Sequence, residues 1–189
     1  MEYRFKSIGK NVTIYPGAKI VGVEHIEIGS NVIIDDFVFI VAAKKTIIGN
    51  YVHIASFTSI TGGGECILED FSTLSSGVRI FTGTEDFAGS GLVNSTIPSK
   101  YRSVVRSKVI VKKHAIIGGN STILPGVVVG EGGTVGAGSI VTGNIDPWTL
   151  NVGAPARKIK VRPSTKILSM EKQLFEEYGL PEKLYQGFE

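Results

Sequence analysis

Two adjacent carboxylates, Glu85 and Asp86, are the side chains of this sequence best suited to accept a proton. They lie in residues 81–108, a segment that has no histidine and does not follow the repeat of the remaining chain. Long segments of this kind usually carry function in a compact fold, and an arm that only joins subunits is the alternative. A carboxylate is a poor base for a hydroxyl and an adequate one for an ammonium group. A turn-capping role without chemistry stays open for Asp86.

The three histidines and the single cysteine are weaker candidates. His53 precedes an inward aliphatic residue, so its side chain is expected to point outward, where it can act as a base or contact the site of a neighbouring copy. His25 and His114 fall between predicted strands, and we expect both to be solvated. Zinc needs converging ligands, and these histidines are too widely spaced to converge, so no metal site is predicted. Cys66 occupies an inward position and is expected to be a small core residue.

The elements that position these residues follow a six-residue repeat. Aliphatic residues stand six apart in triplets whose starts are 20 apart, and a second series then runs without a break. Another small or aliphatic residue stands two positions before most of them, which is the period of a short strand with both side chains facing inward. The repeated residues are Ile8, Ile14, Ile20, Ile28, Ile34, Ile40, Ile48, Ile54, Ile60, Leu68, Leu74, Ile80, Val111, Ile117, Ile123, Val129, Val135 and Val141.

The residues between these strands are mostly glycine, asparagine and aspartate, which favour turns. Three six-residue units return the chain to its starting face, one strand spacing of about 4.8 Å further along the axis. We therefore predict an all-β solenoid for residues 1–162, a triangular prism with three parallel sheets around an aliphatic interior. The repeat stops between Ile80 and Val111, so residues 81–108 are predicted to leave the prism as a long loop.

A compact basic cluster follows the last repeat. Arg157, Lys158, Lys160 and Arg162 stand close together near the end of the prism. Basic side chains beside open backbone amides suit phosphate groups, and a solvated terminal coil is the alternative.

Residues 163–189 are predicted to form a helical tail. The helix is expected to begin at a Ser164 cap and to stop at Gly179 and Pro181. We expect it to cover the open end of the prism with an apolar side. That side contains Leu168, Leu174, Phe175 and Tyr178.

Composition limits the class of protein. With 189 residues, 42% of them hydrophobic and 20% charged, the chain is long enough for one buried domain and too apolar to be disordered. Its 20 basic and 17 acidic residues are too balanced to indicate nucleic-acid binding. One cysteine excludes an intramolecular disulfide and suits a reducing cytosol. The sequence shows no signal segment and no apolar run of membrane-spanning length, so we expect a cytoplasmic protein without membrane insertion.

The sequence IIGGNSTILPGVVVGEGGTVGAGSIVTGNIDPWTLNVGAPARKIKVR, residues 116–162, resembles the coenzyme A half of hexapeptide-repeat acyltransferases. The shared pattern is I-G-x-x-S-x-I-x-P-G-V-x-V-G, followed by V-G-A-G-S-I-V and G-A-P-A-R-K-I. The resemblance implies a left-handed parallel β-helix, against the general preference of parallel crossovers for the right hand. It also implies a homotrimer with coenzyme A between two subunits. Outward apolar residues such as Ile33, Phe39, Ile110 and Ile116 fit such an assembly.

The same resemblance assigns six residues to coenzyme A, and it assigns stabilisation of the thioester oxyanion to backbone amides of the last coils. No metal cofactor is implied. The six residues are Gly119 and Ala137 for the pantetheine arm, Ala154 and Pro155 for the adenine, and Arg157 or Lys158 for the phosphates.

The middle of the chain, YVHIASFTSITGGG followed by FSTLSSGVRIFTGTEDFAGSGLVNSTIP, resembles the branch that acylates nucleotide-linked amino sugars for surface polysaccharides such as lipopolysaccharide O-antigen. In that branch an aspartate in a motif similar to T-E-D-F is the expected partner of the amine, which corresponds to Asp86, with Ser76 of L-S-S-G as a hydrogen-bonding helper. Many other relatives use a loop histidine against a hydroxyl. Its absence here favours transfer from acyl-CoA, with acetyl-CoA as the expected donor, to an amine. The alternatives are O-acetylation with His53 as base and a non-catalytic binding scaffold.

Overall fold

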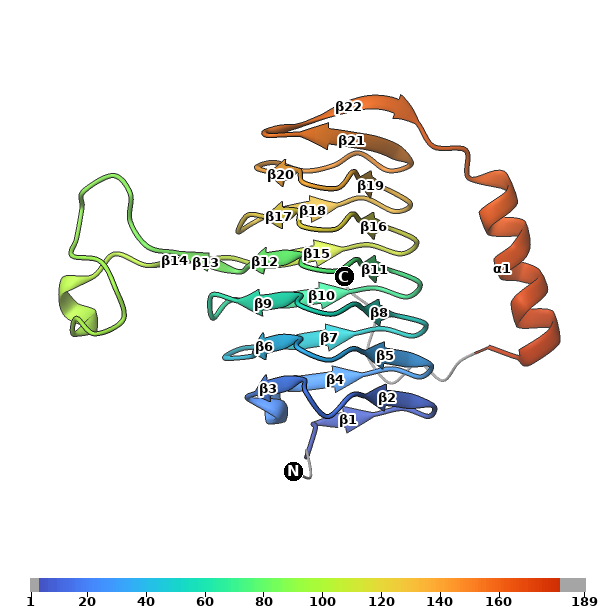
Figure 1. Ribbon diagram of the computed structural model, residues 1–189, viewed down its shortest axis with the longest axis horizontal. Helices are drawn as coiled ribbons and strands as arrows, with labels where there is room; N and C mark the ends of the chain where they lie inside the picture. The colour runs from blue at the N-terminus through green and yellow to red at the C-terminus, as the bar shows by residue number, and fades with distance from the viewer. Residues whose placement is uncertain (1–3, 181–189) are drawn as a thin grey trace.

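The computed structural model describes residues 4–180, which form a three-sided parallel β-helix with one protruding arm and one helix (Figure 1). Each coil adds one short strand to each sheet, so neighbouring strands of a sheet come from successive coils. Sheet A contains β1 (Ser7–Ile8), β4 (Ile26–Ile28), β7 (Thr46–Ile48), β10 (Cys66–Leu68), β15 (Val109–Val111) and β18 (Val128–Val129). Sheet B contains β2 (Val12–Ile14), β5 (Val32–Ile34), β8 (His53–Ile54), β11 (Thr73–Leu74), β16 (Ile116–Ile117), β19 (Thr134–Val135), β21 (Thr149–Gly153) and β22 (Ala156–Val161). Sheet C contains β3 (Lys19–Val21), β6 (Phe39–Val41), β9 (Ser59–Thr61), β12 (Arg79–Phe81), β17 (Thr122–Ile123) and β20 (Ile140–Val141).

The aliphatic residues of the repeat form the core inside the prism. Ile28, Ile48, Leu68 and Val111 stack across sheet A in register, and each is fully or almost fully buried. Ile8 was predicted to be inward in the same way, yet it is 50% exposed, because no coil of the described chain lies beyond it. The stacking of branched aliphatic side chains on flat parallel sheets therefore accounts for the prism.

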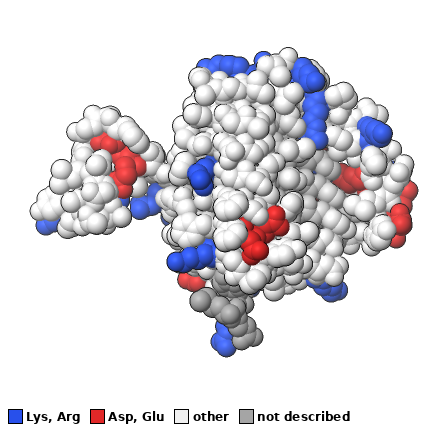
Figure 2. Space-filling view, in the orientation of Figure 1, with Lys and Arg blue, Asp and Glu red and all other residues white. Residues whose placement is uncertain are grey.

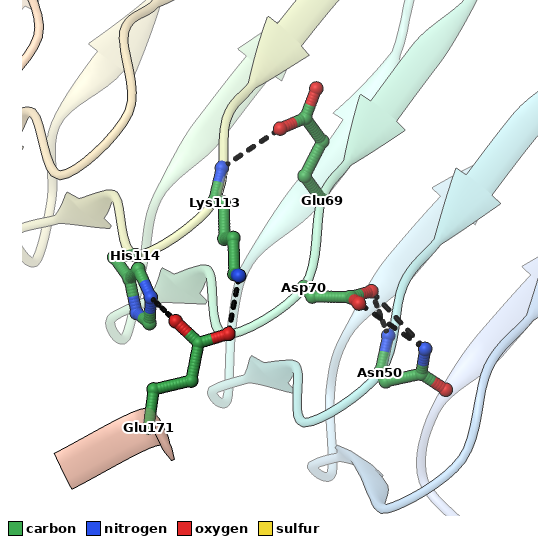
Figure 3. A network of polar contacts seen from close by, with 6 residues as sticks. All are labelled: Asn50, Glu69, Asp70, Lys113, His114 and Glu171. Carbon is green, nitrogen blue, oxygen red and sulfur yellow. Dashed lines mark hydrogen bonds and ion pairs between the residues drawn. The ribbon is translucent and has the colours of Figure 1, made fainter. Parts of the chain in front are cut away.

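Polar ladders tie the coils together at the corner between sheets A and B (Figure 3). The side-chain oxygen of Asn50 accepts the amide of Ser30 at 2.8 Å. The Asp70 carboxylate accepts the amide of Asn50 at 2.7 Å. Glu69 accepts the amide of Lys113 at 3.0 Å in the same manner. These bonds satisfy backbone donors that the turning chain would otherwise leave unpaired.

Helix α1 (Thr165–Tyr178) lies along the side of the prism at this corner, so the prediction that it covers the open end is wrong (Figure 1). The Glu171 carboxylate binds Lys113 Nζ and lies 2.8 Å from His114 Nε2 (Figure 3). The ring of Phe175 packs against Phe71 at 5.8 Å between centroids. His114 was expected to be solvated, and it is buried by this contact. The burial of that imidazole and the ring contact hold the helix on the prism.

The ends of α1 follow the prediction in part. Ser164 stands at the cap position, but its side chain makes no capping hydrogen bond, and the helix ends at Gly179 with φ of 80°. Among the predicted apolar residues, Leu174 and Phe175 are half-buried, whereas Leu168 and Tyr178 are exposed, because only one edge of the helix contacts the corner. Pro181 lies outside the described residues.

The arm leaves the prism after β12 and returns at β15, as the interruption of the repeat predicts (Figure 1). The neck of the arm is a short antiparallel pair of strands, β13 (Gly83–Thr84) with β14 (Val105–Arg106). Beyond the neck, the arm contains the 3-10 helix η2 (Ser99–Tyr101). A second 3-10 helix, η1 (Val23–His25), connects β3 to β4. No helix in residues 4–180 is long and apolar enough to cross a membrane.

Candidate active site

Asp86 lies in the arm directly beyond its neck, and its carboxylate closes a turn of the arm. One oxygen accepts the amide of Ala88 at 2.8 Å. The other accepts the amide of Ser90, the hydroxyl of Ser90 at 2.9 Å and the amide of Gly91 at 3.1 Å. The bond from Ala88, followed by that from the Ser90 hydroxyl, lowers the pKa of Asp86, since hydrogen bonds to the charged form favour it. The carboxylate is therefore ionised near neutral pH and is a weaker base than an ordinary aspartate.

Glu85 points to a different partner. Its Oε1 atom binds the guanidinium of Arg102, and both side chains are largely shielded from solvent. Glu85 was predicted as a catalytic candidate. In the described structure one of its oxygens is held by a cation, whereas both oxygens of Asp86 accept hydrogen bonds from the turn.

A cavity of about 540 Å³ opens beside Glu85 and Phe87, the two residues that flank Asp86 in the chain. Phe81, Phe87, Leu124 and Pro125 line most of it, and Thr84 and Glu85 supply its polar edge. An apolar hollow with a few polar groups is the usual form of a small-molecule site. The base of the arm, with Glu85 at its polar edge, thus stands next to a space in which a ligand fits.

Ser76 lies at the corner between sheets B and C, close to two of the predicted coenzyme A residues. A Cβ atom placed on Gly119 would lie 3.1 Å from the carbonyl oxygen of Ser76, and the amide of Gly138 donates to the carbonyl oxygen of Gly119 at 2.8 Å. Ala137 is the neighbour of Gly138 in the next coil. Ser76, Gly119 and Ala137 therefore follow one another along this corner in three successive coils, and their small side chains leave its surface open to a long, narrow ligand.

The hairpin β21–β22 lies next to the same corner. The amide of Gly153 donates to the Ser139 side chain at 3.1 Å, and the hairpin turn contains Ala154 and Pro155, joined by a cis peptide bond. The exposed side chain of Arg157 borders, with that of Lys158, a hollow of about 250 Å³.

Lys and Arg side chains gather at this end of the prism (Figure 2). Arg162, a member of the predicted basic cluster, is engaged elsewhere, because its guanidinium donates to the carbonyl oxygens of His114 and Gly132 at 2.8 and 2.9 Å. Burial lowers the pKa of Arg162. Arg157, Lys158 and Lys160 are exposed and are therefore better placed than Arg162 for a phosphate group.

His53 points outward from sheet B, as predicted, and pairs with a carboxylate. Its Nε2 atom lies 3.1 Å from Asp35 Oδ2, and the imidazole is nearly half exposed. Such a pair can orient an imidazole for proton transfer. His53 occupies β8, and no hydrogen bond in residues 4–180 joins it to the arm.

The predicted residues thus form three separate groups within one chain: the arm carboxylates, the corner with the hairpin, and the face of sheet B. Ser76 precedes β12 and Asp86 follows it, and no hydrogen bond between the two is found in the described residues. Sequence reasoning missed Arg102 and Asp35, because each pairs with a residue far away in the chain. Ser90, four residues after Asp86, is a local turn signal that could have been recognised.

Cysteine and metal chemistry find no support in the described chain. Cys66 is buried in the core as predicted, and burial raises the pKa of its thiol to about 12, so it stays protonated. Within residues 4–180, no three His, Cys, Asp or Glu side chains are grouped so that they could hold a metal ion.

Comparison with known proteins places the chain in a family, although no family model matches it. The dTDP-4-amino-4,6-dideoxy-D-glucose acyltransferase of Escherichia coli is 40% identical over 171 residues, which cover 90% of this chain and 88% of that protein. AntD, an N-acyltransferase from Bacillus cereus, was crystallised with dTDP and coenzyme A as a variant of one aspartate; that structure is 44% identical, has a TM-score of 0.87 and covers 92% of each chain. Other AntD structures carry variants of one serine or contain dTDP-4-amino-4,6-dideoxyglucose or 3-hydroxybutyryl-CoA.

More distant structures share the fold alone. A hexapeptide-repeat acetyltransferase from Vibrio cholerae is 21% identical, with a TM-score of 0.56 over 84% of this chain and 75% of that one. The predicted left-handed β-helix and the family resemblance are both confirmed. The chain belongs to the hexapeptide-repeat acyltransferases, in the group that contains the dTDP-amino-sugar N-acyltransferases of Escherichia coli and Bacillus cereus.

Proposed function

We propose that this protein transfers the acyl group of an acyl-CoA, with acetyl-CoA as the first candidate donor, to the amino group of a nucleotide-linked sugar. The observation that carries the proposal is a serine and an aspartate at the same separation as the two residues that were varied in AntD. The serine and the aspartate of that protein stand ten positions apart in its sequence, and Ser76 and Asp86 are also ten apart (86 − 76 = 10). The dTDP-4-amino sugar named for the Escherichia coli relative is the first acceptor to test.

In the proposed reaction, the amine nitrogen attacks the thioester carbonyl carbon, the carbon–sulfur bond breaks, and the products are an amide and free coenzyme A. The ionised Asp86 attracts the substrate ammonium and orients the amine. Its lowered pKa makes it a weak base toward a resting ammonium. The nitrogen becomes far more acidic as it bonds to the carbonyl carbon, and Asp86 accepts the proton at that stage. Ser76 serves as a hydrogen-bonding helper, and a backbone amide of the late coils stabilises the oxyanion.

Coenzyme A is proposed to lie along the corner that carries Ser76, Gly119 and Ala137, with its adenine near Ala154 and Pro155. The small residues permit close approach of the pantetheine arm. The cations needed for its phosphates are Arg157 and Lys158, which stand exposed at the end of that corner.

A homotrimer would bring the separate groups together. Ser76 and Asp86 lie on opposite sides of β12, so we propose that the arm of one copy meets the corner of the next. Exposed apolar residues on the sheets, including Ile33, Phe39 and Ile116, support contact between copies, whereas Ile110 is half-buried. Light scattering should report three times the monomer mass, and a monomer at micromolar concentration would contradict the shared site.

We place the activity in the cytoplasm, in the synthesis of surface polysaccharides such as lipopolysaccharide O-antigen, because the family resemblance points to that branch. The alternative favoured by a specific observation is O-acetylation, since His53 and Asp35 form the kind of pair that can activate a hydroxyl. A non-catalytic scaffold is the other alternative.

One experiment separates these functions. Isotope-labelled acetyl-CoA is offered with a dTDP-4-amino sugar and, in parallel, with the matched sugar that carries a hydroxyl in place of the amine. Label on the amine alone supports the proposal, and label on the hydroxyl sugar supports O-acetylation. Because the acyl chain length is open, 3-hydroxybutyryl-CoA is tested beside acetyl-CoA. If neither donor transfers its acyl group to either sugar, the result supports the non-catalytic scaffold.

A further inference from the structure

We propose that Arg102 is a positioning residue for Asp86 and acts through its ion pair with Glu85; this inference rests on the proposed amine acylation. Arg102 follows η2, seventeen residues after Glu85 along the arm. Its side chain is only 14% exposed, although the arm projects from the prism (Figure 1). A charge that is shielded in this way in a protruding loop requires a reason.

The ion pair closes a ring of contacts that contains Asp86. Leu92 forms a bridge with Arg102, and the amide of Leu92 donates to the carbonyl oxygen of Tyr101 at 2.8 Å. Asp86 binds the amides of Ala88, Ser90 and Gly91, the three residues that lead to Leu92. The ring runs from Asp86 through the turn to Leu92 and crosses there to Arg102. The guanidinium of Arg102 then binds Glu85, which is adjacent to Asp86.

Besides the backbone contacts of Leu92, the ring has two side-chain links of different kinds. The hydrogen bonds made by the Asp86 carboxylate determine the shape of the turn itself. The bond between Glu85 and Arg102 joins that turn to the opposite strand of the arm, just beyond the β13–β14 neck. Without this second link, the turn keeps its own hydrogen bonds and the backbone bond of Leu92 to Tyr101, but its beginning at Glu85 is no longer tied to Arg102. The Asp86 carboxylate, next to Glu85, then loses part of its constraint.

Stability does not account for the pair. Guanidinium and carboxylate groups commonly form two parallel bonds, yet here only one joins them. Arg102 Nε and Glu85 Oε2, the atoms available for a second bond, are both buried without a hydrogen-bond partner. A partly exposed ion pair with two buried, unpaired atoms contributes little to folding, because the desolvation of those atoms is not compensated. Its position beside the proposed catalytic carboxylate offers the explanation.

The test uses Arg102→Gln, Glu85→Gln, the double variant and Arg102→Lys in the full-length protein. We expect kcat with the amino sugar to fall by roughly tenfold or more, since a small misplacement of a reacting group has effects of this size. The KM values for acyl-CoA and for the nucleotide sugar should stay near those of the parent. The double variant should be no slower than either single variant, and Arg102→Lys, which keeps the charge, should recover part of the rate. Lys172→Gln, which removes a cation paired on the exposed side of α1, is the matched control.

A second measurement does not depend on catalysis. Hydrogen–deuterium exchange should accelerate in residues 86–92 of Arg102→Gln and Glu85→Gln, with no change in the coils of the prism. If the parent transfers no acyl group to amines, the proposed function fails, and the exchange result still decides the positioning role. Parent-like exchange together with parent-like kcat would overturn the inference. A raised KM for the nucleotide sugar at unchanged kcat would also overturn it, because Arg102 would then bind substrate directly.

Discussion

Replacing Asp86 by Asn should remove most of the acyl transfer and leave coenzyme A affinity nearly unchanged. The substitution takes away the negative charge that attracts the ammonium and that later accepts a proton from the nitrogen as it bonds to the thioester carbon. It also changes the turn, because the amide of Ala88 and the donors of Ser90 and Gly91 bind opposite oxygens of the carboxylate. Asn keeps one oxygen and presents an NH₂ group where the second oxygen was, so one donor of the turn would face another donor. Asp86→Asn is therefore not a shape-neutral substitution.

The expected size of the effect is about a hundredfold or more in kcat, the usual contribution of a positioned acid or base. Two effects contribute to it: the lost charge and the disturbed turn. Ser90→Ala separates them, because it removes one hydrogen bond to the carboxylate and retains the charge. We expect Ser90→Ala to lower kcat by only a few-fold, since three backbone donors remain bound to the aspartate.

The pH dependence gives an independent reading of the same group. Because the pKa of Asp86 is lowered from 3.8, the carboxylate is charged throughout the neutral range and would be protonated only below that ordinary value. The rise of kcat/KM with pH should therefore report the sugar ammonium as it loses its proton. No acid limb from Asp86 should appear above about pH 4.

The assay follows release of free coenzyme A with a thiol reagent, with a dTDP-4-amino sugar as acceptor, and coenzyme A binding is measured by calorimetry. An Asp86→Asn enzyme that works within about threefold of the parent would refute the proposed role. The reasoning also fails if Ser90→Ala is as slow as Asp86→Asn. In that case the shape of the turn, and not the charge, would control the reaction.

Three further predictions concern the other sites. His53→Asn should have a mild effect on amine acylation, and an inactive variant would instead favour O-acetylation; the same coenzyme A release assay decides. Joint replacement of Arg157 and Lys158 by Ala should weaken coenzyme A binding more than it lowers kcat, and parent-like affinity by calorimetry would show that the phosphates bind elsewhere. Glu171→Gln should loosen helix α1 by about 1–3 kcal/mol, because the charged partner of His114 is lost. Faster hydrogen exchange in the helix alone would confirm this effect, and exchange at the parent rate would contradict it.

The prism and its core could be predicted because burial in a β-helix depends on local phase. Whether Ile48 or Leu68 faces inward follows from its position within a six-residue unit, since each unit is one strand and one turn. The interruption of the same period revealed the arm, and the tandem motifs of residues 116–162 indicated the family. The prediction that α1 covers the open end of the prism was wrong. The period of a helix predicts that it has an apolar side, but not which surface of the protein that side contacts.

The partners of the charged residues could not be predicted from local phase. Glu85 and Arg102 are 17 residues apart in a segment with no period, and His114 and Glu171 are 57 apart. No spacing in the chain connects such pairs, because they form only when the arm doubles back or when the tail returns along the prism. The sequence could therefore identify Asp86 as a candidate catalytic residue from its motif. The hydrogen bonds that keep its carboxylate ionised come from residues 88–91 of the same local turn. The ion pair beside it depends on how distant segments approach one another in the folded chain.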